Sequence, residues 1–317
     1  MRWMTLCAAT LVFTATASAA GLKVDRKTIE AKSTAYEIKA EYPQTGVKAI
    51  DQEIAGWVEG EVATFKKEAA PEQDSAGGAW TLDIGYTVER NDADVLALLF
   101  TLSSYTGGAH GSHVFRTWNF LLPEGTRVDL AQVLDGGKAL AKLSGIAVAD
   151  LNKQLLTPDG MTDADWIKRG AGPDWGNFED FLLLPDAIKI EFPQYQVAAY
   201  AAGPQEVRVP LSALSGLLRK DPRVPAASFD CAKAATAVER AICADGALAR
   251  LDREVAQAYG QRLADIEAAS DKEAVRVAQR GWLERRNAAC KDQTGTALGA
   301  CLTGVYRTRL AELSATP

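Results

Sequence analysis

The cysteines that follow residue 229 constrain this chain more than any other feature. Cys231, Cys243, Cys290 and Cys301 lie in a stretch whose apolar residues recur at helical spacing. An even number of cysteines is typical of disulfide-bonded proteins from oxidising compartments. Two long antiparallel helices could bring Cys243 near Cys290, but four cysteines allow three pairings and the sequence does not choose among them. Residues 229–317 are therefore expected to form a small all-α domain held by disulfides.

Local signals place the helices of this domain. Thr236 is the expected N-cap of a short helix that ends at Cys243, with Glu239 at the capping-box position. Three longer helices are predicted in the ranges 248–263, 275–290 and 302–310, because their apolar residues recur at three- and four-residue steps.

Gln279, Trp282 and Arg286 share one face of the third of these helices, and two interpretations apply to them. Trp and Arg are common binding anchors at interfaces. They also lie on the apolar face, where Trp fills a core and Arg pairs with a carboxylate such as Asp252. We favour the core interpretation. Surface contacts are then expected from residues off that face, namely Arg276, Arg280 and Arg285.

Residues 1–20 have the pattern of a secretion signal. Arg2 gives a positive start, residues 3–16 are mostly apolar, and Ala17-Ser18-Ala19 is a small-residue motif, so cleavage is expected near Ala19 or Ala20. The apolar stretch is too short to span a membrane, and no later segment reaches about 18 consecutive apolar residues. Cys7 follows Leu6 rather than a small residue, which disfavours lipidation. A soluble periplasmic or secreted protein is expected.

Residues 21–218 alternate between strand and helix patterns. Strands are predicted at 36–42, 80–88, 95–105, 118–122, 187–192 and 206–209. Helices are predicted at 50–65, 137–156 and 211–218, and a glycine-rich loop at 170–176. Antiparallel strands with helices inserted between hairpins favour an α+β domain over 21–218. Residues 219–228 carry two prolines and several charges, which predicts a linker to the helical domain.

The net charge is unevenly distributed. Residues 21–228 carry a net charge of −8 and residues 229–317 a net charge of +1. An acidic domain argues against a nucleic-acid partner and would steer a basic protein partner toward it. The alternative is that this charge only keeps the domain soluble.

The segment from Tyr105 to His113 is the most unusual part of the acidic domain. It contains Gly107, Gly108 and the H-x-x-H pair His110 and His113, the only histidines in the chain. Such a pair can serve a metal or acid–base site, contact a partner, or stabilise a tight turn. Two ligands do not make a zinc site, and no cysteine in this domain adds a third. We favour the turn, keep these residues as binding candidates, and expect no metal and no cofactor.

Residues 34–218 resemble the extracytoplasmic domain pair of RsiV-type lysozyme-sensing anti-sigma factors and PdaC-type peptidoglycan deacetylases. The residues that carry the resemblance are Tyr36, Ile38, Tyr42, Pro43, Ile54, Trp57, Gly107-Gly108-Ala109-His110, Trp118-Asn119-Phe120, Phe192, Tyr195, Val197, Ala198 and Tyr200. The resemblance implies an envelope recognition module. The membrane span and sigma-binding part of such sensors, and the deacetylase domain, have no counterpart here.

Residues 229–313 resemble the N-terminal family of the lysozyme inhibitor LprI. The shared pattern comprises the four cysteines with Phe229, Asp230, Glu239, Ile242, Leu248, Leu251, Asp252, Tyr259, Gln279, Trp282, Leu283, Arg286, Asn287, Leu302, Tyr306 and Arg309. The resemblance implies an exported helical domain, with lysozyme inhibition in some members. Members are often lipoproteins, and this chain lacks the lipidation motif.

These observations favour a binding protein over an enzyme. The sequence has no G-x-S-x-G, no glycine-rich phosphate loop with Lys and no H-E-x-x-H motif. Our leading hypothesis is a periplasmic protein that recognises or inhibits lysozyme or another basic peptidoglycan hydrolase. One alternative is a module that binds peptidoglycan or another glycan without inhibiting an enzyme, and another is a hydrolase or deacetylase that acts through His110.

Overall fold

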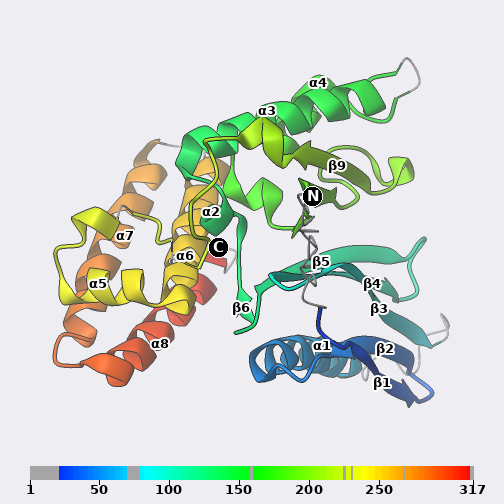
Figure 1. Cartoon of the computed structure of the whole chain (residues 1–317), viewed down its shortest axis with the longest axis horizontal. Helices are drawn as coiled ribbons and strands as arrows, with labels where there is room; N and C mark the ends of the chain where they lie inside the picture. Colours follow the sequence, from blue (N-terminus) through cyan, green and yellow to red (C-terminus); the bar gives the residue numbers. More distant parts are fainter. Residues whose placement is uncertain are drawn as a thin grey trace, which may run out of the picture.

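The structure is a computed structural model that describes residues 21–69, 79–157, 160–223, 226–229, 231–266 and 269–314. The expected signal segment 1–20 lies outside these residues. Two β-sheets with flanking helices form the N-terminal part, and a bundle of helices forms the C-terminal part (Figure 1). The α+β and all-α classes predicted for the two parts are confirmed. Among the described residues, no helix is both long and apolar enough to cross a membrane.

The first sheet has six strands in the order β1-β2-β3-β4-β5-β6. Their bounds are Asp25–Lys32, Tyr36–Gln44, Trp80–Asn91, Val95–Tyr105, Ser112–Leu121 and Thr126–Arg127. The sheet is antiparallel except for β2 and β3, which run parallel because helix α1 (Lys48–Ala69) crosses over between them. The expectation of antiparallel strands was therefore wrong for this pair, since a crossover helix returns the chain in the same direction.

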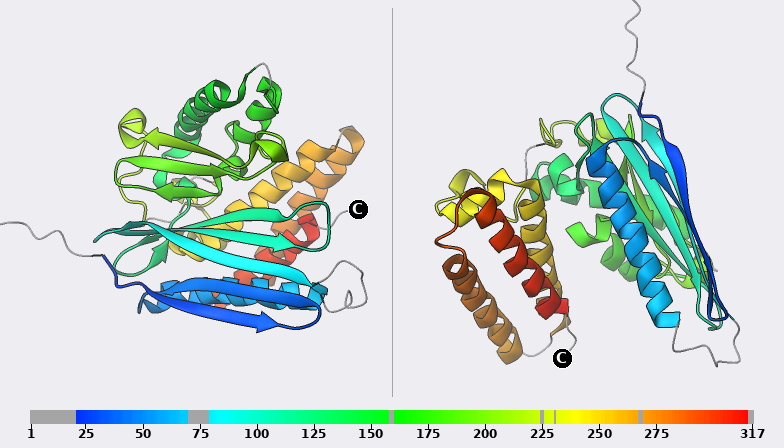
Figure 2. Two further views of the ribbon diagram at one scale, coloured as in Figure 1. Left: turned by 90° about the vertical axis from the view of Figure 1, so that its right-hand side faces the viewer. Right: turned by 90° about the horizontal axis from the view of Figure 1, so that it is seen from below.

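Helix α1 covers one face of this sheet (Figure 2). Its buried residues recur at helical spacing, and they pack on the inward-facing residues of β2, β3, β4 and β5. Trp57, Phe100 and Trp118 meet edge to face at the centre of this core, with ring centroids 4.8–5.2 Å apart. This packing makes β4 and β5 a rigid base for the hairpin that joins them.

The second sheet has three antiparallel strands, β7 (Phe181–Leu183), β8 (Ala187–Phe192) and β9 (Gln205–Pro210). Helices α2 (Leu130–Val133), α3 (Gly136–Leu155) and α4 (Ala164–Ala171) pack with it around a separate core. Short 3-10 turns complete it: η2 (Trp175–Phe178), η3 (Tyr200–Ala202) and η4 (Leu211–Leu214).

Two local predictions for this part were wrong. The helix expected at 211–218 is only the turn η4, because Gly216 adopts a positive φ of 75° that a right-handed helix excludes. The loop expected at 170–176 begins inside α4 and ends inside η2. Helix α4 itself was not predicted, and Asp163 caps its start by accepting a hydrogen bond from the Trp166 backbone nitrogen.

Asn119 joins the two sheets. Its side-chain nitrogen donates to the Phe181 carbonyl at 2.9 Å, and its oxygen accepts from the Leu183 nitrogen at 2.7 Å. A buried amide that satisfies both of its groups in this way holds β5 against β7, so the two sheets are fixed to each other through specific hydrogen bonds.

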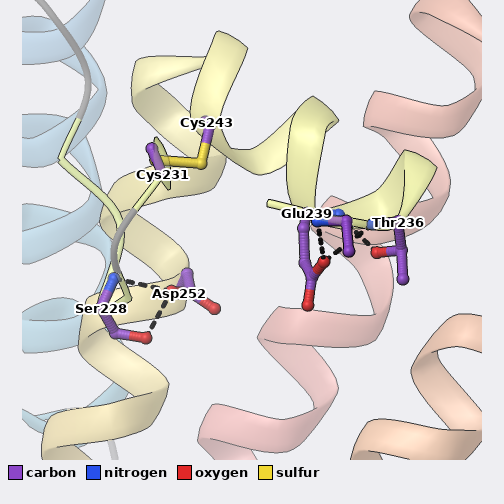
Figure 3. Close-up of a disulfide and its surroundings, with 7 residues drawn as sticks. Ser228, Cys231, Thr236, Glu239, Cys243 and Asp252 are labelled. Atoms are coloured by element: carbon purple, nitrogen blue, oxygen red, sulfur yellow. Dashed lines mark hydrogen bonds between the residues drawn. A yellow bond between two sulfur atoms is a disulfide. The ribbon is translucent and has the colours of Figure 1, made fainter. Parts of the chain in front are cut away.

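The C-terminal part contains the turn η5 (Cys231–Lys233) and four helices, α5 (Ala237–Ala244), α6 (Gly246–Asp265), α7 (Ala269–Ala289) and α8 (Gly295–Ser314). The predicted Thr236–Glu239 capping box is confirmed (Figure 3). Disulfides join Cys231 to Cys243 and Cys290 to Cys301. Antiparallel helices could have allowed Cys243 to pair with Cys290, but this bond does not form. Each cysteine is instead bonded to the cysteine that lies closest to it along the chain.

The described part of segment 219–228 lies against the folded domains. Arg223 donates to the Leu122 carbonyl at 2.9 Å, and Ser228 donates to Asp252 of α6 through its backbone nitrogen at 2.8 Å and its hydroxyl at 2.6 Å. Figure 3 shows the latter pair beside the Cys231–Cys243 bond. The segment thus connects the parts through specific hydrogen bonds.

Candidate functional site

The β4–β5 hairpin carries the candidate residues identified from sequence. Its turn contains Gly107 with a φ of 86°, a conformation that favours glycine. The His110 ring stacks on Tyr200 with centroids 4.1 Å apart, and the Tyr200 hydroxyl donates to the Gly111 carbonyl at 3.0 Å. The hairpin tip is therefore fixed to the second sheet's η3 turn.

The two histidines have different partners. His113 Nδ1 shares a 2.9 Å hydrogen bond with Ser103 Oγ, whereas His110 Nδ1 contacts the Gly111 carbonyl at 2.9 Å. Within the described ranges, no three or more His, Cys, Asp or Glu side chains are grouped so as to hold a metal ion. Tyr105 and Gly108 lie on the same hairpin, and Tyr105 is exposed.

Beside the hairpin, Tyr195 is both exposed and conformationally unusual. Its side chain is 56% exposed, and its φ of 71° is positive, although it is not a glycine. Its ring centroid lies 5.7 Å from that of Tyr200, and the Trp166 indole donates to its carbonyl at 3.1 Å. We call His110, Trp166, Tyr195 and Tyr200 the aromatic edge. Positive φ at a bulky residue is strained, and such strain concentrates at binding sites.

The sequence motif of the helical domain lies in its core. Trp282 and Arg286 are buried, and the Arg286 guanidinium lies 5.6 Å from the Trp282 ring centroid. Arg286 donates to the Tyr306 hydroxyl at 2.6 Å, which donates to Asp252 at 2.6 Å. Burial and the nearby Asp252 carboxylate raise the pKa of Tyr306, so its hydroxyl stays protonated. The structure therefore places this motif where it stabilises the bundle.

Gln279 belongs to the same network, since its side-chain oxygen accepts two hydrogen bonds from Arg309, at 2.9 and 3.1 Å. The surface candidates on α7 lie on its outer side. Arg280 pairs with Glu273 at 2.9 Å, and Arg276 pairs with the same carboxylate at 3.6 Å. Ion pairs this exposed contribute little to stability, so these cations stay accessible to a partner.

The molecule therefore has the architecture of a two-sheet α+β part followed by a disulfide-bonded helical module. Three family models match successive segments of it: "Deacetylase PdaC" over residues 29–113, "Protein of unknown function (DUF3298)" over 133–212 and "Lysozyme inhibitor LprI" over 231–313. Both resemblances expected from the sequence are confirmed. The first two matches also separate the two sheets.

The related proteins match only parts of the chain. The peptidoglycan-N-acetylmuramic acid deacetylase PdaC of Bacillus subtilis is 28% identical over 189 residues, which are 58% of this chain and 39% of that protein. Lipoprotein LprI of Mycobacterium tuberculosis is 37% identical over 87 residues, 27% of this chain and 41% of the lipoprotein. A solved DUF3298 protein from Pseudomonas aeruginosa is 18% identical with a TM-score of 0.49 and covers 63% of this chain and 96% of that one.

The sequence pointed to the hairpin but not to all of its surroundings. Tyr195 and Tyr200 were part of the family resemblance, yet no spacing rule places them against a hairpin that lies about ninety residues earlier. The charged residues where α6 meets the two sheets were not singled out at all. Arg253 of α6 pairs with Asp129, and Arg250 lies 3.9 Å from Glu53 of α1.

Proposed function

We propose that this protein is an extracytoplasmic binding protein that recognises lysozyme or a related peptidoglycan hydrolase. The observation that carries the proposal is the match of residues 231–313 to the lysozyme-inhibitor family, in a chain whose residues 29–113 match a deacetylase family, with a segment of unknown function between them. The expected signal peptide and the two disulfides are in keeping with an oxidising compartment outside the cytoplasm.

The proposed contact surface is the aromatic edge. An exposed, strained tyrosine backed by stacked rings is a rigid anchor that loses little conformational freedom on binding. The net charge of −8 over residues 21–228 attracts a basic enzyme before contact. A partner held there would have its substrate cleft covered, which is the proposed mechanism of inhibition.

Calorimetric titration of the mature chain with a c-type lysozyme tests this function. We expect micromolar or tighter binding that weakens between low and physiological salt, because surface charges are screened. Absence of binding at both salt concentrations contradicts the proposed function, whereas binding without salt dependence contradicts only the charge attraction.

A Tyr195→Gly variant tests the contact surface. Glycine tolerates the positive φ of Tyr195, so folding stability is expected to stay the same or rise. Affinity should fall by at least about tenfold if the ring is an anchor. Val88→Ala is the control, since Val88 is also exposed but lies on β3, away from the aromatic edge. Equal affinities for the two variants would place the contact elsewhere.

A second candidate function is binding of peptidoglycan itself, without inhibition of an enzyme. The row of rings in the aromatic edge favours it, because flat aromatic surfaces present an apolar face beside polar groups. Co-sedimentation with insoluble peptidoglycan separates the two functions: retention of the protein on the wall material without lysozyme affinity would establish the second.

A further inference from the structure

A cleft of about 840 Å³ lies where the first sheet, the second sheet's helices and α6 meet. Arg116 and Thr117 of β5 form one wall, Trp175 and Phe178 of η2 another, and α6 closes it with Arg253. Its lining mixes apolar side chains such as Trp175 and Phe178 with charged ones such as Glu179. Cavities of this size at domain junctions are typical places for small-molecule sites. None of the residues of the aromatic edge lines this cleft.

Unpaired polar atoms gather at this cleft. Among the described residues, four buried side-chain polar atoms have no hydrogen-bond partner, and three of them belong to cleft-lining residues: Thr117 Oγ1, Asp129 Oδ1 and Arg253 Nη1. Thr117 is only 5% exposed. A buried polar atom without a partner destabilises the fold, and in native proteins it often indicates a bound water or ligand.

Two arginines that line the cleft are already paired with carboxylates. Arg253 pairs with Asp129, and Arg127 pairs with Glu53 at 2.8 Å. Arg253 itself is largely buried, with 14% of its side chain exposed, and this burial lowers its pKa. An ionic ligand would disturb these pairs, so a neutral ligand is favoured.

The unpaired atoms define what such a ligand must offer. Arg253 Nη1 is a donor and needs an acceptor, whereas Asp129 Oδ1 is an acceptor and needs a donor. The two side chains contact each other, so the ligand must present a donor and an acceptor close together. A secondary amide does this with its N–H and C=O groups.

We propose that this cleft binds a neutral ligand that carries a secondary amide, as an acetamido sugar or a short peptide does. The amide N–H donates to Asp129 and its carbonyl accepts from Arg253, while the Thr117 hydroxyl supplies a third hydrogen bond. The apolar part of the ligand packs on Trp175 and Phe178. Since neighbouring side chains cover the three atoms, Arg253 shifts when the ligand enters.

Calorimetric titration of the mature chain with three probes tests the proposal. N,N′,N″-triacetylchitotriose carries acetamido groups, cellotriose is the matched trisaccharide with hydroxyls in their place, and N-acetyl-alanyl-alanine amide represents a peptide. We expect chitotriose or the peptide to bind and cellotriose to bind at least about tenfold more weakly, the effect of losing one or two good hydrogen bonds. The amide probe that binds identifies the source of the ligand.

Two variants locate the binding in the cleft. Thr117→Val removes the unpaired hydroxyl with little change of shape, so the fold should be at least as stable while affinity falls by about tenfold. Thr101→Val, on the neighbouring strand β4 and outside the cleft, is the matched control. Gly137→Phe is a second test of the location, because Gly137 lines the cleft and a Cβ added there meets no other atom within 4 Å, so the bulky ring should compete with a ligand for this space.

Binding of cellotriose as tight as that of chitotriose would overturn the assignment of an amide ligand. Unchanged affinity in both Thr117→Val and Gly137→Phe would show that the ligand does not bind in this cleft. Failure of every probe to bind at millimolar concentration would also overturn the proposal, whatever the outcome of the lysozyme titration.

Discussion

Asp180 lies between the two sheets with its carboxylate largely removed from water. Its side chain accepts a hydrogen bond from the Thr117 backbone nitrogen at 3.1 Å. Burial raises its pKa from 3.8 to about 6, although the Arg116 guanidinium and this hydrogen bond act in the opposite direction, and Glu179 and Glu191 add to the rise. The charged form is therefore less stable in the folded chain than in the unfolded chain.

This environment predicts a pH effect on stability. Between pH 3.8 and about 6 the folded chain retains the Asp180 proton that the unfolded chain has lost, so this residue's contribution to the free energy of unfolding falls as pH rises. Asp180→Asn removes the charge and keeps an acceptor for Thr117. The variant should be about 1–3 kcal/mol more stable than the parent at pH 7.5 and no more stable near pH 3.5. Urea denaturation at both pH values measures the difference.

Asp94→Asn is the control for this prediction. Asp94 is exposed in the turn before β4, and its substitution should change stability by less than about 0.5 kcal/mol at either pH. A gain for Asp180→Asn that is the same at both pH values would show that the charge is not its cause.

The elements differ in how far the sequence predicts them. The bounds of β4 and β8 were predicted correctly. β4 is a nearly continuous apolar run, and in β8 apolar residues alternate with Lys189 and Glu191, which is the period of a strand. Strand β1 was missed, since its sequence is rich in charged residues and most of its side chains are exposed. It is an edge strand whose partner is β2, so its conformation depends on backbone hydrogen bonds to another segment.

The candidate site on the β4–β5 hairpin was predictable only in part, because it also depends on contacts with distant segments of the chain. Composition singled out the glycines and histidines of the β4–β5 hairpin, because they are locally unusual. The stacking of His110 on Tyr200 and the approach of Arg253 to Asp129 depend on how whole domains pack, which no local pattern encodes.

The Cys290–Cys301 bond links the end of α7 to α8. We expect its removal to destabilise this pair of helices. Closing a loop of this length stabilises a domain by about 3 kcal/mol. The double variant Cys290→Ala, Cys301→Ala should lose about that amount in urea denaturation followed by circular dichroism. The corresponding pair at Cys231 and Cys243 spans 12 residues rather than 11 and should behave alike. A reductant opens both bonds, so it should destabilise the parent more than either double variant is destabilised. An unchanged midpoint in the variants would contradict the prediction.

The whole molecule is held together across α6. Arg253 pairs with Asp129, and Gln257 donates to Glu179 at 3.0 Å, so the helical module contacts both the α2 region and the η2 region of the N-terminal part. The Arg253 side chain is 14% exposed, which makes the loss of its charge more costly than at the surface.

Arg253→Met should therefore loosen the docking of the helical module without unfolding it. Proteolysis within 219–228 should become faster, and small-angle scattering should show a larger radius of gyration. Arg250→Met is the matched control one turn earlier on α6, since Arg250 lies 3.9 Å from Glu53 and should contribute less. Identical proteolysis of both variants and the parent would show that Arg253 does not hold the module.

The sequential pairing of the cysteines has a consequence for biogenesis. Each bond joins neighbours in sequence, at separations of 12 and 11 residues, so neither requires the tertiary fold to bring its partners together. In the export that we propose, the chain enters an oxidising compartment from its N-terminus, and the first pair can then close before the second pair arrives. The helical module should thus mature with the correct bonds through simple oxidation, independently of enzymes that reshuffle disulfides.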